Sequence, residues 1–415
     1  INTCVVGRDN RHTSASLQEA LMDGLQASGT HVVDIGLVAT PLVYWHAVKL
    51  GKVGGAMVTA SHLGPQHNGF KLCIGNRTIY GDALQSLYAI IRRDAFFHGR
   101  GTRKAEIGAY GKYTRDIAER IPMARSLRVA VDAGNGTAGL FIPRLLQLWV
   151  HEIIPLYLEP DGDFPNHPAN PQDEANLQDL AQMVRETGAD IGLAFDGDSD
   201  RVGVVDENGN MLVADRVLAL LARDILKRHP GAAVVADVLS SQVLFDVVEA
   251  AGGKPIMAPS GHSLVKDVMR QHSALLGGEM SGHIFLAENY YGYDDAFFAA
   301  GRILQLLSAS HQPLSTLDDE LPRLYSTPEY RPHCPDEDKE RVIAGVAQAL
   351  SDKGEVVDVD GVRIKFARGW GLLRASNTEP VLSLRFEGET EADALSYRDI
   401  FAEALRAYPQ VEPIV

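Results

Sequence analysis

The sequence predicts an α/β protein with three tandem domains of similar topology, each built on a mixed or largely parallel sheet, and a smaller C-terminal α+β domain. Apolar runs bounded by Gly or Asp alternate with segments of helical period over most of the chain, which is typical of βαβ units. The length of 415 residues, at roughly 150 residues per domain, favours about three domains. We expect the chain to divide into residues 1–107, 108–207, 208–324 and 325–415.

Strands of the first three domains are expected where short apolar runs lie between turn residues. They are Thr3–Val6, Val53–Val58, Arg128–Asp132, Ile153–Leu158, Ala189–Phe195 and Ala274–Leu276. Helices are expected over Leu140–Trp149 and in a segment where apolar side chains recur every three or four residues. The apolar residues of that segment are Leu177, Leu180, Met183 and Val184. Residues 160–171 are rich in turn formers and are expected to form a loop.

The last domain is expected to contain two strands, Val356–Ile364 and Leu382–Glu387, around a Gly-rich turn. Thr390 is a suitable N-cap for a closing helix, and Pro409 is expected to follow the end of that helix. One face of this helix contains Leu395, Phe401 and Leu405.

Composition excludes several classes of protein. Lys and Arg number 39 and Asp and Glu number 54, so the net charge is −15 and the surface repels nucleic acids. Three widely spaced cysteines, Cys4, Cys73 and Cys334, disfavour a disulfide framework and a structural zinc site, and they indicate a reducing cytoplasm. No apolar stretch approaches the ~20 residues that span a bilayer, and no signal peptide is recognised. We expect a small-molecule substrate, no membrane partner, and a monomer or weak homo-oligomer.

Three apolar strands each run into an abrupt polar loop. The loops are Thr59-Ala-Ser-His62, Asp196-Gly-Asp-Ser-Asp200 and Gly277-Gly-Glu-Met-Ser-Gly-His283. Ligands of open α/β sheets bind beyond the carboxyl ends of the strands. Domains of like topology are therefore expected to bring one loop each to a shared site.

The acidic loop predicts a site for a hard cation. Asp196, Asp198 and Asp200 follow a buried strand, and three negative charges there are unfavourable unless a cation neutralises them. Oxygen ligands alone favour Mg²⁺. An EF-hand Ca²⁺ loop is an alternative because Glu207 falls at its twelfth position, although Arg201 occupies the sixth position, where Gly is required. A solvated polar turn is the simpler alternative, whereas Arg201 would suit a phosphate that bridges to the metal.

The serine loop offers a nucleophile. Ser61 and His62 place a hydroxyl beside an imidazole, as a phosphoryl carrier needs, although the pair taken alone fits an ordinary turn better. Lys71 follows within ten residues and is able to reach a phosphate from there.

Two further motifs offer ligands for a sugar phosphate. Glu279, Ser281 and His283 bring a carboxylate, a hydroxyl and an imidazole to one Gly-hinged loop, a set suited to vicinal sugar hydroxyls. The segment Arg374-Ala-Ser-Asn-Thr378 combines a fixed cation with a turn that can expose successive N–H groups to a phosphate. An ordinary turn is the alternative for each motif.

Together these motifs resemble those of the α-D-phosphohexomutase superfamily, within it the bacterial phosphomannomutase/phosphoglucomutase branch. The family has a phosphoserine loop T-[AG]-S-H-N-P, a metal loop D-G-D-[GS]-D-R, a sugar loop G-E-M-S-G-H and a phosphate loop R-[AP]-S-[NG]-T-E-P. The matching segments are Thr59–His62, Asp196–Arg201, Gly278–His283 and Arg374–Pro380. The likeness runs in register over nearly all 415 residues.

The resemblance implies a four-domain, heart-shaped enzyme that converts a hexose 1-phosphate to the 6-phosphate, of mannose or glucose or both. Ser61 would carry the phosphoryl group, beside His62. A hexose 1,6-bisphosphate would be the intermediate and the activator. Mg²⁺ would be held by Ser61, Asp196, Asp198 and Asp200.

The other roles follow from the same likeness. Lys71 and His283 match positions proposed for proton transfer, and Arg201 would assist at the phosphoserine. Sugar contacts would come from Glu279 and Ser281, at the 3- and 4-hydroxyls, and from His262. The non-reacting phosphate would be bound by Arg374, Ser376, Asn377 and Thr378.

Three features depart from the family pattern. Leu63-Gly64 replaces the Asn-Pro after the Ser-His pair, which leaves the loop looser, and Leu239 replaces a Lys. The Y-D-I-R-G segment, which supplies an active-site Arg, is absent before Ile1. A sugar-phosphate-binding relative with weakened or lost mutase activity is therefore an alternative. A phosphoglucosamine mutase is a lesser one, disfavoured by Met280.

Overall fold

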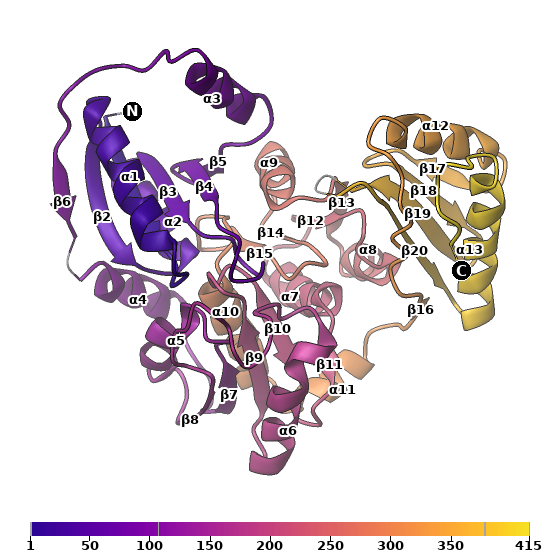
Figure 1. Cartoon of the computed structure of the whole chain (residues 1–415). Helices are drawn as coiled ribbons and strands as arrows, with labels where there is room; N and C mark the ends of the chain where they lie inside the picture. Colours follow the sequence, from indigo (N-terminus) through magenta and orange to yellow (C-terminus); the bar gives the residue numbers. More distant parts are fainter. Residues whose placement is uncertain (1, 107, 377–378, 415) are drawn as a thin grey trace.

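A computed structural model describes residues 2–106, 108–376 and 379–414. Four sheets follow one another along the chain. Figure 1 shows the first and last sheets at the two upper ends of a heart-shaped outline, with the second and third between and below them. The expected fold class is confirmed: three α/β units of similar topology precede a C-terminal α+β unit. Among the described residues, no helix combines the length and the apolar character needed to cross a membrane.

The first sheet has the strand order β5-β4-β3-β1-β2-β6. Its strands are β1 (Thr3–Arg8), β2 (His31–Leu37), β3 (Gly54–Val58), β4 (Phe70–Ile74), β5 (Arg77–Thr78) and β6 (Arg103–Ala105). The helices are α1 (Ser14–Ala27), α2 (Thr40–Lys49) and α3 (Asp82–Arg92). Helices α1 and α2 cover opposite faces of the sheet. Alternate residues of the strands pack against one helix or the other, because successive strand residues point to opposite sides. Helix α3 stands away from the sheet, and each of its residues is at least partly exposed (Figure 1).

The second and third sheets have the orders β11-β10-β9-β7-β8 and β13-β12-β14-β15. The second unit contains β7 (Arg128–Asp132), β8 (Glu152–Leu156), β9 (Ile191–Phe195), β10 (Val202–Val205), β11 (Met211–Leu212), α4 (Ala109–Arg120), α5 (Ala138–Leu146), the short 3-10 helix η1 (Glu174–Leu177) and α6 (Gln178–Thr187). The third contains β12 (Ala233–Asp237), β13 (Lys254–Ala258), β14 (Leu276–Gly278), β15 (Ile284–Leu286), α7 (Ala214–Arg228), α8 (Gln242–Ala250), α9 (His262–His272), α10 (Ala296–Ala309) and α11 (Leu314–Asp319).

One topology occurs in each of the first three units. The first strand of the unit, β1, β7 or β12, lies between two parallel neighbours. The third strand, β3, β9 or β14, then pairs antiparallel with the strand that follows it in the chain. The serine, acidic and sugar loops connect these antiparallel partners. The same position in three sheets therefore carries the three motifs, as the sequence predicts.

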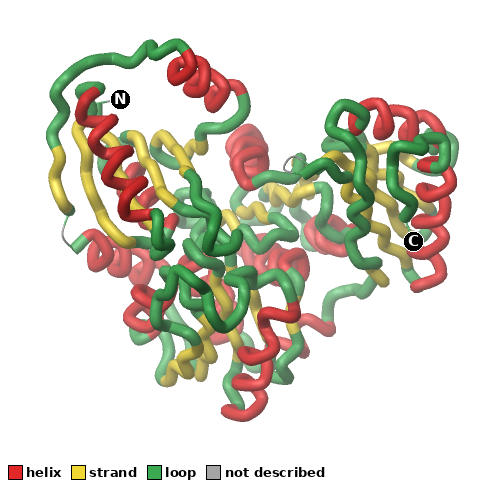
Figure 2. The backbone as a smooth tube through the Cα atoms, viewed as in Figure 1, coloured by secondary structure: helices red, strands yellow, loops and turns green. Residues whose placement is uncertain are grey.

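The last sheet is antiparallel, with the order β16-β20-β19-β18-β17. Its elements are β16 (Tyr325–Ser326), β17 (Glu355–Val357), β18 (Val362–Phe366), β19 (Gly369–Ala375), β20 (Leu382–Gly388), α12 (Lys339–Ala349) and α13 (Glu391–Leu405). Figure 2 shows both helices on the outer side of this sheet. Thr390 forms the expected cap, in a capping box with Asp393.

Two expectations for this unit are wrong. The segment Val356–Ile364 is two strands, because the chain reverses before Gly361, which has φ +79°, and β17 then pairs with β18. The Gly-rich segment before Leu382 contains a regular strand, β19. A Cβ at Gly371 would lie 2.7 Å from the ring of Phe401, so glycine at this position lets α13 approach the strand closely.

We propose one change to the domain boundaries. The expected boundary between residues 207 and 208 falls inside the β10–β11 hairpin, in which Val204 pairs with Leu212. Since a hairpin folds as one unit, we place this boundary after Leu212.

A buried arginine joins the last unit to the third. Arg363 donates 2.7 Å to the carbonyl of Val238, and its guanidinium lies 3.7 Å from the ring centre of Trp370. The indole of Trp370 in turn donates 2.7 Å to Glu387. Leu239, which follows Val238, packs at this junction. Leu239, which departs from the family pattern, therefore lies where the last unit is attached to the third.

A shared hydrophobic core holds the first three units together. Phe297 of α10 is completely buried. Its ring centre lies 5.5 Å from that of Phe195 and 6.4 Å from those of Tyr113 and Phe141. Because these rings come from the second and third units, the core fixes the relative positions of the acidic and sugar loops.

We expect Phe297→Ala to lower the free energy of unfolding by about 3–5 kcal/mol, since it leaves a cavity at this junction. Phe97→Ala is the matched control, because the Phe97 side chain is 84% exposed; it should change the free energy by less than about 0.5 kcal/mol. Urea denaturation followed by circular dichroism measures both. Equal losses of unfolding free energy in the two variants would contradict the placement of Phe297 in the shared core.

Candidate active site

The three polar loops contact one another. The Ser61 hydroxyl donates 2.6 Å to Asp196, so the serine and acidic loops meet directly. Arg201 and His283 form a β-bridge, which joins the acidic and sugar loops. The structure thus brings together, at one place, predicted residues from all three α/β units.

Ser61 is held in a conformation that presents its hydroxyl to the acidic loop. Its φ of +52° lies in the left-handed region, and its N–H donates 2.9 Å to the Thr59 hydroxyl. His62 Nδ1 lies 3.4 Å from Ser61 Oγ. Burial, assisted by the charge of Arg201, lowers the pKa of His62 to about 4, so its imidazole is neutral at physiological pH.

The acidic loop lies against the serine loop. A Cβ at Gly197 would lie 2.6 Å from the Ser61 carbonyl oxygen, which explains the glycine between the first two aspartates. Asp196, Asp198 and Asp200 are all completely buried. Their ligand atoms lie within 4.8 Å of one another. Burial, together with the other two carboxylates, raises the pKa of Asp196 well above its usual range.

Two cations partly neutralise this cluster. Lys71 of β4 lies 2.7 Å from Asp198 and also pairs with Asp200. Although burial opposes it, the attraction of these carboxylates raises the pKa of Lys71, which therefore stays protonated. The Arg201 guanidinium lies 3.9 Å from Asp196.

The residues of the acidic loop fit a divalent metal ion. Asp198 Oδ1 and Asp200 Oδ1 are buried, and among the described residues no hydrogen-bond donor reaches either atom. A cation would satisfy both oxygens. The flanking elements are the strands β9 and β10, which excludes the EF-hand alternative because that motif is a helix–loop–helix.

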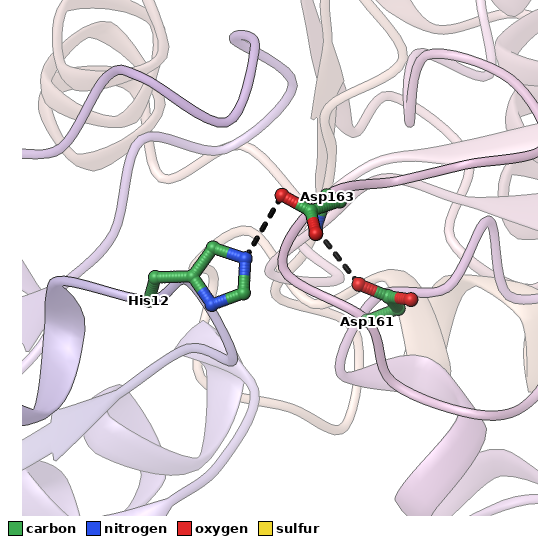
Figure 3. Close-up of side chains that lie close together, drawn as sticks. All are labelled: His12, Asp161 and Asp163. Carbon is green, nitrogen blue, oxygen red and sulfur yellow. Dashed lines mark hydrogen bonds and ion pairs between the residues drawn. The ribbon is translucent and has the colours of Figure 1, made fainter.

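A second acidic cluster lies on the surface (Figure 3). His12 Nε2 is 2.9 Å from a carboxylate oxygen of Asp163, and the Asp163 N–H donates 2.9 Å to Asp161. The side chains of His12 and Asp163 are 63% and 68% exposed. Exposed acidic groups need no cation, so this cluster serves as a comparison for the buried one.

The sugar loop places a carboxylate beside the start of α9. Glu279 accepts a 2.6 Å hydrogen bond from the Gly261 N–H. Burial, followed by the charge of Asp237, raises the pKa of Glu279 to about 8. Ser281 lies at the partly exposed tip of the same loop.

His283 and His262 lie together in this loop region. Their rings are stacked with centres 5.2 Å apart. Arg201 donates 3.1 Å to His283 Nε2. Burial, followed by the charges of Arg201 and His262, lowers the pKa of His283 well below its usual range, so the imidazole is neutral.

Asp294 is a buried residue of the site that sequence reasoning missed. It lies 2.9 Å from His262 and 2.7 Å from Lys266. Burial alone would raise the pKa of Asp294, but Lys266 and then His262 lower it well below its usual range. Asp294 also forms a possible ligand group with Asp200 and His283. The loop of three aspartates is the better site for a hard cation, because it offers three carboxylates, whereas this group offers two carboxylates and an imidazole.

The predicted phosphate loop lies across the junction with the last unit. Arg374 pairs at 2.9 Å with Asp360, which also accepts 3.0 Å from the Ser260 N–H of the third unit. Lys339 of α12 donates 2.9 Å to the Ser376 carbonyl. Asn377 and Thr378 lie outside the described residues.

Comparisons with known proteins agree with this geometry. Models of phosphoglucomutase/phosphomannomutase domains match the chain in order: α/β/α domain I at residues 1–98, domain II at 111–209, domain III at 214–325 and the C-terminal domain at 330–404. A phosphomannomutase/phosphoglucomutase of Pseudomonas putida is 42% identical over 98% of this chain and 88% of its own length. A phosphoglucomutase of Neisseria gonorrhoeae is 41% identical over 98% and 89%.

The fold of this chain also matches that of a protein of known crystal structure. A phosphoglucomutase/phosphomannomutase family protein from Burkholderia thailandensis superposes with a TM-score of 0.94 at 38% identity, covering 99% of this chain and 91% of its own.

We expect a divalent cation to bind at the three aspartates and to raise the melting temperature, because a ligand at 100 times its Kd stabilises a fold by about 2.7 kcal/mol. Thermal unfolding with and without Mg²⁺ or Mn²⁺ measures the shift. Asp198→Asn should abolish it, and Asp161→Asn, in the surface cluster, should leave it unchanged. A shift lost only in Asp161→Asn would place the cation at the surface cluster instead.

We expect Glu279→Gln to become more stable, relative to the unaltered protein, as pH rises from about 4.5 to about 8. In this window the folded state still holds the Glu279 proton that the unfolded state has lost, so the carboxyl group opposes folding increasingly as pH rises. Urea denaturation across this pH range gives the difference. Glu340→Gln, at an exposed glutamate, is the control, and an equal trend there would contradict the assignment.

Proposed function

This chain belongs to the phosphoglucomutase/phosphomannomutase family and is a phosphohexomutase, and from that premise we propose that it transfers a phosphoryl group between the 1- and 6-positions of a hexose through phosphorylated Ser61. The observation that carries the proposal is the 2.6 Å contact between Ser61 Oγ and Asp196. This contact puts a nucleophilic oxygen beside a carboxylate cluster that fits a divalent cation.

The transfer runs in two halves. In the first, the bond from phosphorus to Ser61 Oγ breaks as a bond from phosphorus to a sugar hydroxyl oxygen forms, which gives a hexose 1,6-bisphosphate. In the second, the other phosphoryl group returns from the bisphosphate to Ser61. The bisphosphate is the intermediate and must turn over within the site between the two halves. Because it can give a phosphoryl group to Ser61, it is also the activator.

The protonation states of the site suit these steps. We assign His283 as the base that takes the hydroxyl proton, because burial keeps its imidazole neutral. Arg201 would turn from His283 Nε2 to the phosphoryl oxygens and free that nitrogen. Lys71, held as a cation, would give a proton to Ser61 Oγ as the phosphoryl group leaves. The second half reverses both proton transfers.

Mg²⁺ is the cation that we propose, held by Asp196, Asp198, Asp200 and Ser61. When bound, it would neutralise negative charge on the transferring phosphoryl group. The neutral His62, 3.4 Å from Ser61 Oγ, leaves this charge balance unchanged while it packs beside the nucleophile.

The substrate would lie between the sugar loop and the last unit. Glu279 and Ser281 would bind sugar hydroxyls, with His262 as a further contact. Arg374, Ser376, Asn377 and Thr378 would bind the non-reacting phosphate. Arg374 would exchange Asp360 for that phosphate, since a guanidinium pairs with a phosphate as it does with a carboxylate.

We also propose that the reaction takes place in the cytoplasm, which the buried, unpaired state of Cys4, Cys73 and Cys334 supports. The state of the protein that we propose is a monomer or weak homo-oligomer.

We expect ³¹P NMR to record a 6-phosphate forming from mannose 1-phosphate or glucose 1-phosphate when Mg²⁺ and a trace of glucose 1,6-bisphosphate are present. Ser61→Ala should lower the rate by at least about 10³-fold, since the phosphoryl carrier is lost. Ser86→Ala, at an exposed serine on α3, is the control. A Ser61→Ala variant as fast as the unaltered protein would refute the phosphoserine.

The same spectra test the alternative function. Leu63-Gly64 in the serine loop favours a sugar-phosphate-binding relative without turnover. That function requires binding of the sugar phosphate, measured by calorimetry, with no 6-phosphate formed from either sugar. Glucosamine 1-phosphate, tested in parallel, distinguishes a phosphoglucosamine mutase.

A further inference from the structure

The guanidinium of Arg11 is the main anchor of the serine loop. Arg11 follows β1, and its side chain is completely buried. Arginine has five N–H donors, and each of them has an acceptor here. Nε donates 3.0 Å to Asp9. The other acceptors are backbone carbonyl oxygens: Nη2 donates to Ser61 at 2.7 Å and Leu63 at 2.6 Å, and Nη1 to Gly64 at 2.7 Å and His67 at 3.2 Å.

The loop itself contributes little packing. Leu63, Gly64 and His67 are exposed, so their side chains do not hold the chain in the core. Ser61, by contrast, has a left-handed φ, a conformation that persists only where its surroundings impose it. Four carbonyl oxygens on one rigid guanidinium supply that constraint. The looseness expected from Leu63-Gly64 is therefore offset by a residue on another element.

Arg11 is itself fixed from two sides. Asp9 accepts both the Arg11 N–H, at 3.1 Å, and Nε, and the Ser14 hydroxyl binds the same carboxylate. The guanidinium lies 5.1 Å from the ring centre of Phe164, which belongs to the second unit. Gly197 lies against the same ring, because a Cβ there would be 3.6 Å from it. The anchor and the acidic loop therefore share one support.

We propose that Arg11 is a positioning residue for phosphoryl transfer: it holds Ser61 Oγ in line with the acidic loop by gathering the carbonyl oxygens of residues 61, 63, 64 and 67. The inference rests on the proposed role of Ser61 as the phosphoryl carrier. The contact of Arg11 with Ser61 is to the carbonyl oxygen, so Arg11 acts on the nucleophile through the backbone. The positive charge of Arg11 would not by itself hold the loop. A lysine ammonium carries the same charge but has only three donors and no planar fork.

The test compares Arg11→Lys with Arg302→Lys. Arg302 is a buried arginine of α10 that pairs with Glu288 at 2.6 Å, far in sequence from the serine loop. Both variants keep the positive charge and lose a guanidinium. The kcat of Arg11→Lys should fall about 100-fold, the effect of a misplacement of about 1 Å, while KM changes by less than about threefold. Arg302→Lys should keep its kcat, whatever its loss of melting temperature.

Hydrogen exchange provides a readout that does not depend on activity. The N–H groups of Leu63 and His67 are bonded within the loop, to Ala60 and Gly64. Their exchange should accelerate by about tenfold or more in Arg11→Lys, as expected when a hydrogen bond worth about 1.4 kcal/mol is lost, and stay unchanged in Arg302→Lys. Unchanged exchange in Arg11→Lys would overturn the anchoring. Faster exchange with full kcat would overturn the positioning role.

Failure of the proposed function can be distinguished from failure of the inference about Arg11. If the unaltered protein forms no 6-phosphate, phosphoserine transfer is refuted by that result alone, and with it the positioning role, while the exchange rates still decide whether Arg11 anchors the loop.

Discussion

The burial of three carboxylates at one loop is the constraint on which the rest of the structure depends. Asp196, Asp198 and Asp200 lose their hydration completely, and such charges are tolerated only when cations and donors surround them. Lys71 reaches the cluster from the first unit and Arg201 from the second. The sharp folding of the acidic loop and the close approach of the serine loop follow from the need to keep these oxygens partnered. The remaining unpartnered oxygens are those that fit a metal ion.

The fold meets this constraint through repetition. Each of the first three units ends a parallel strand in a loop and returns by an antiparallel strand, so the loops occupy equivalent edges of their sheets. The shared core around Phe297 then sets the three edges against one another. The last unit has a different, antiparallel sheet and joins through Arg363 and Trp370. The same junction includes Arg385, which donates 2.7 Å to the Leu239 carbonyl, and Glu387, which accepts 2.9 Å from the Ser241 hydroxyl.

Much of the site was predictable, because its central residues stand in short polar segments directly after apolar strands. Ser61, Asp196 and Glu279 all have this signal. Arg11 has the same signal, after β1, but no nearby motif indicates what it binds, since its acceptors are backbone carbonyls. Asp294 precedes an apolar helix without any distinctive spacing, and its partners lie on α9. Strand β19 was missed because its glycines are typical of a turn. Only the tertiary structure explains them, since a Cβ at Gly371 would meet the rings of Phe401 and Phe386, and one at Gly369 would meet the carbonyl oxygen of Glu387.

The sequence by itself determined the fold class, the order of the units and the chemical character of each loop, because these depend on local periodicity and on residue types within a few positions. The tertiary structure alone decided which side chains meet. It placed Lys71 on Asp198, stacked His262 on His283 and gave Arg11 four carbonyl acceptors. It also set the protonation states, since the pKa of a buried group depends on neighbours that are distant along the chain. Such contacts arise only when separate sheets pack on one core.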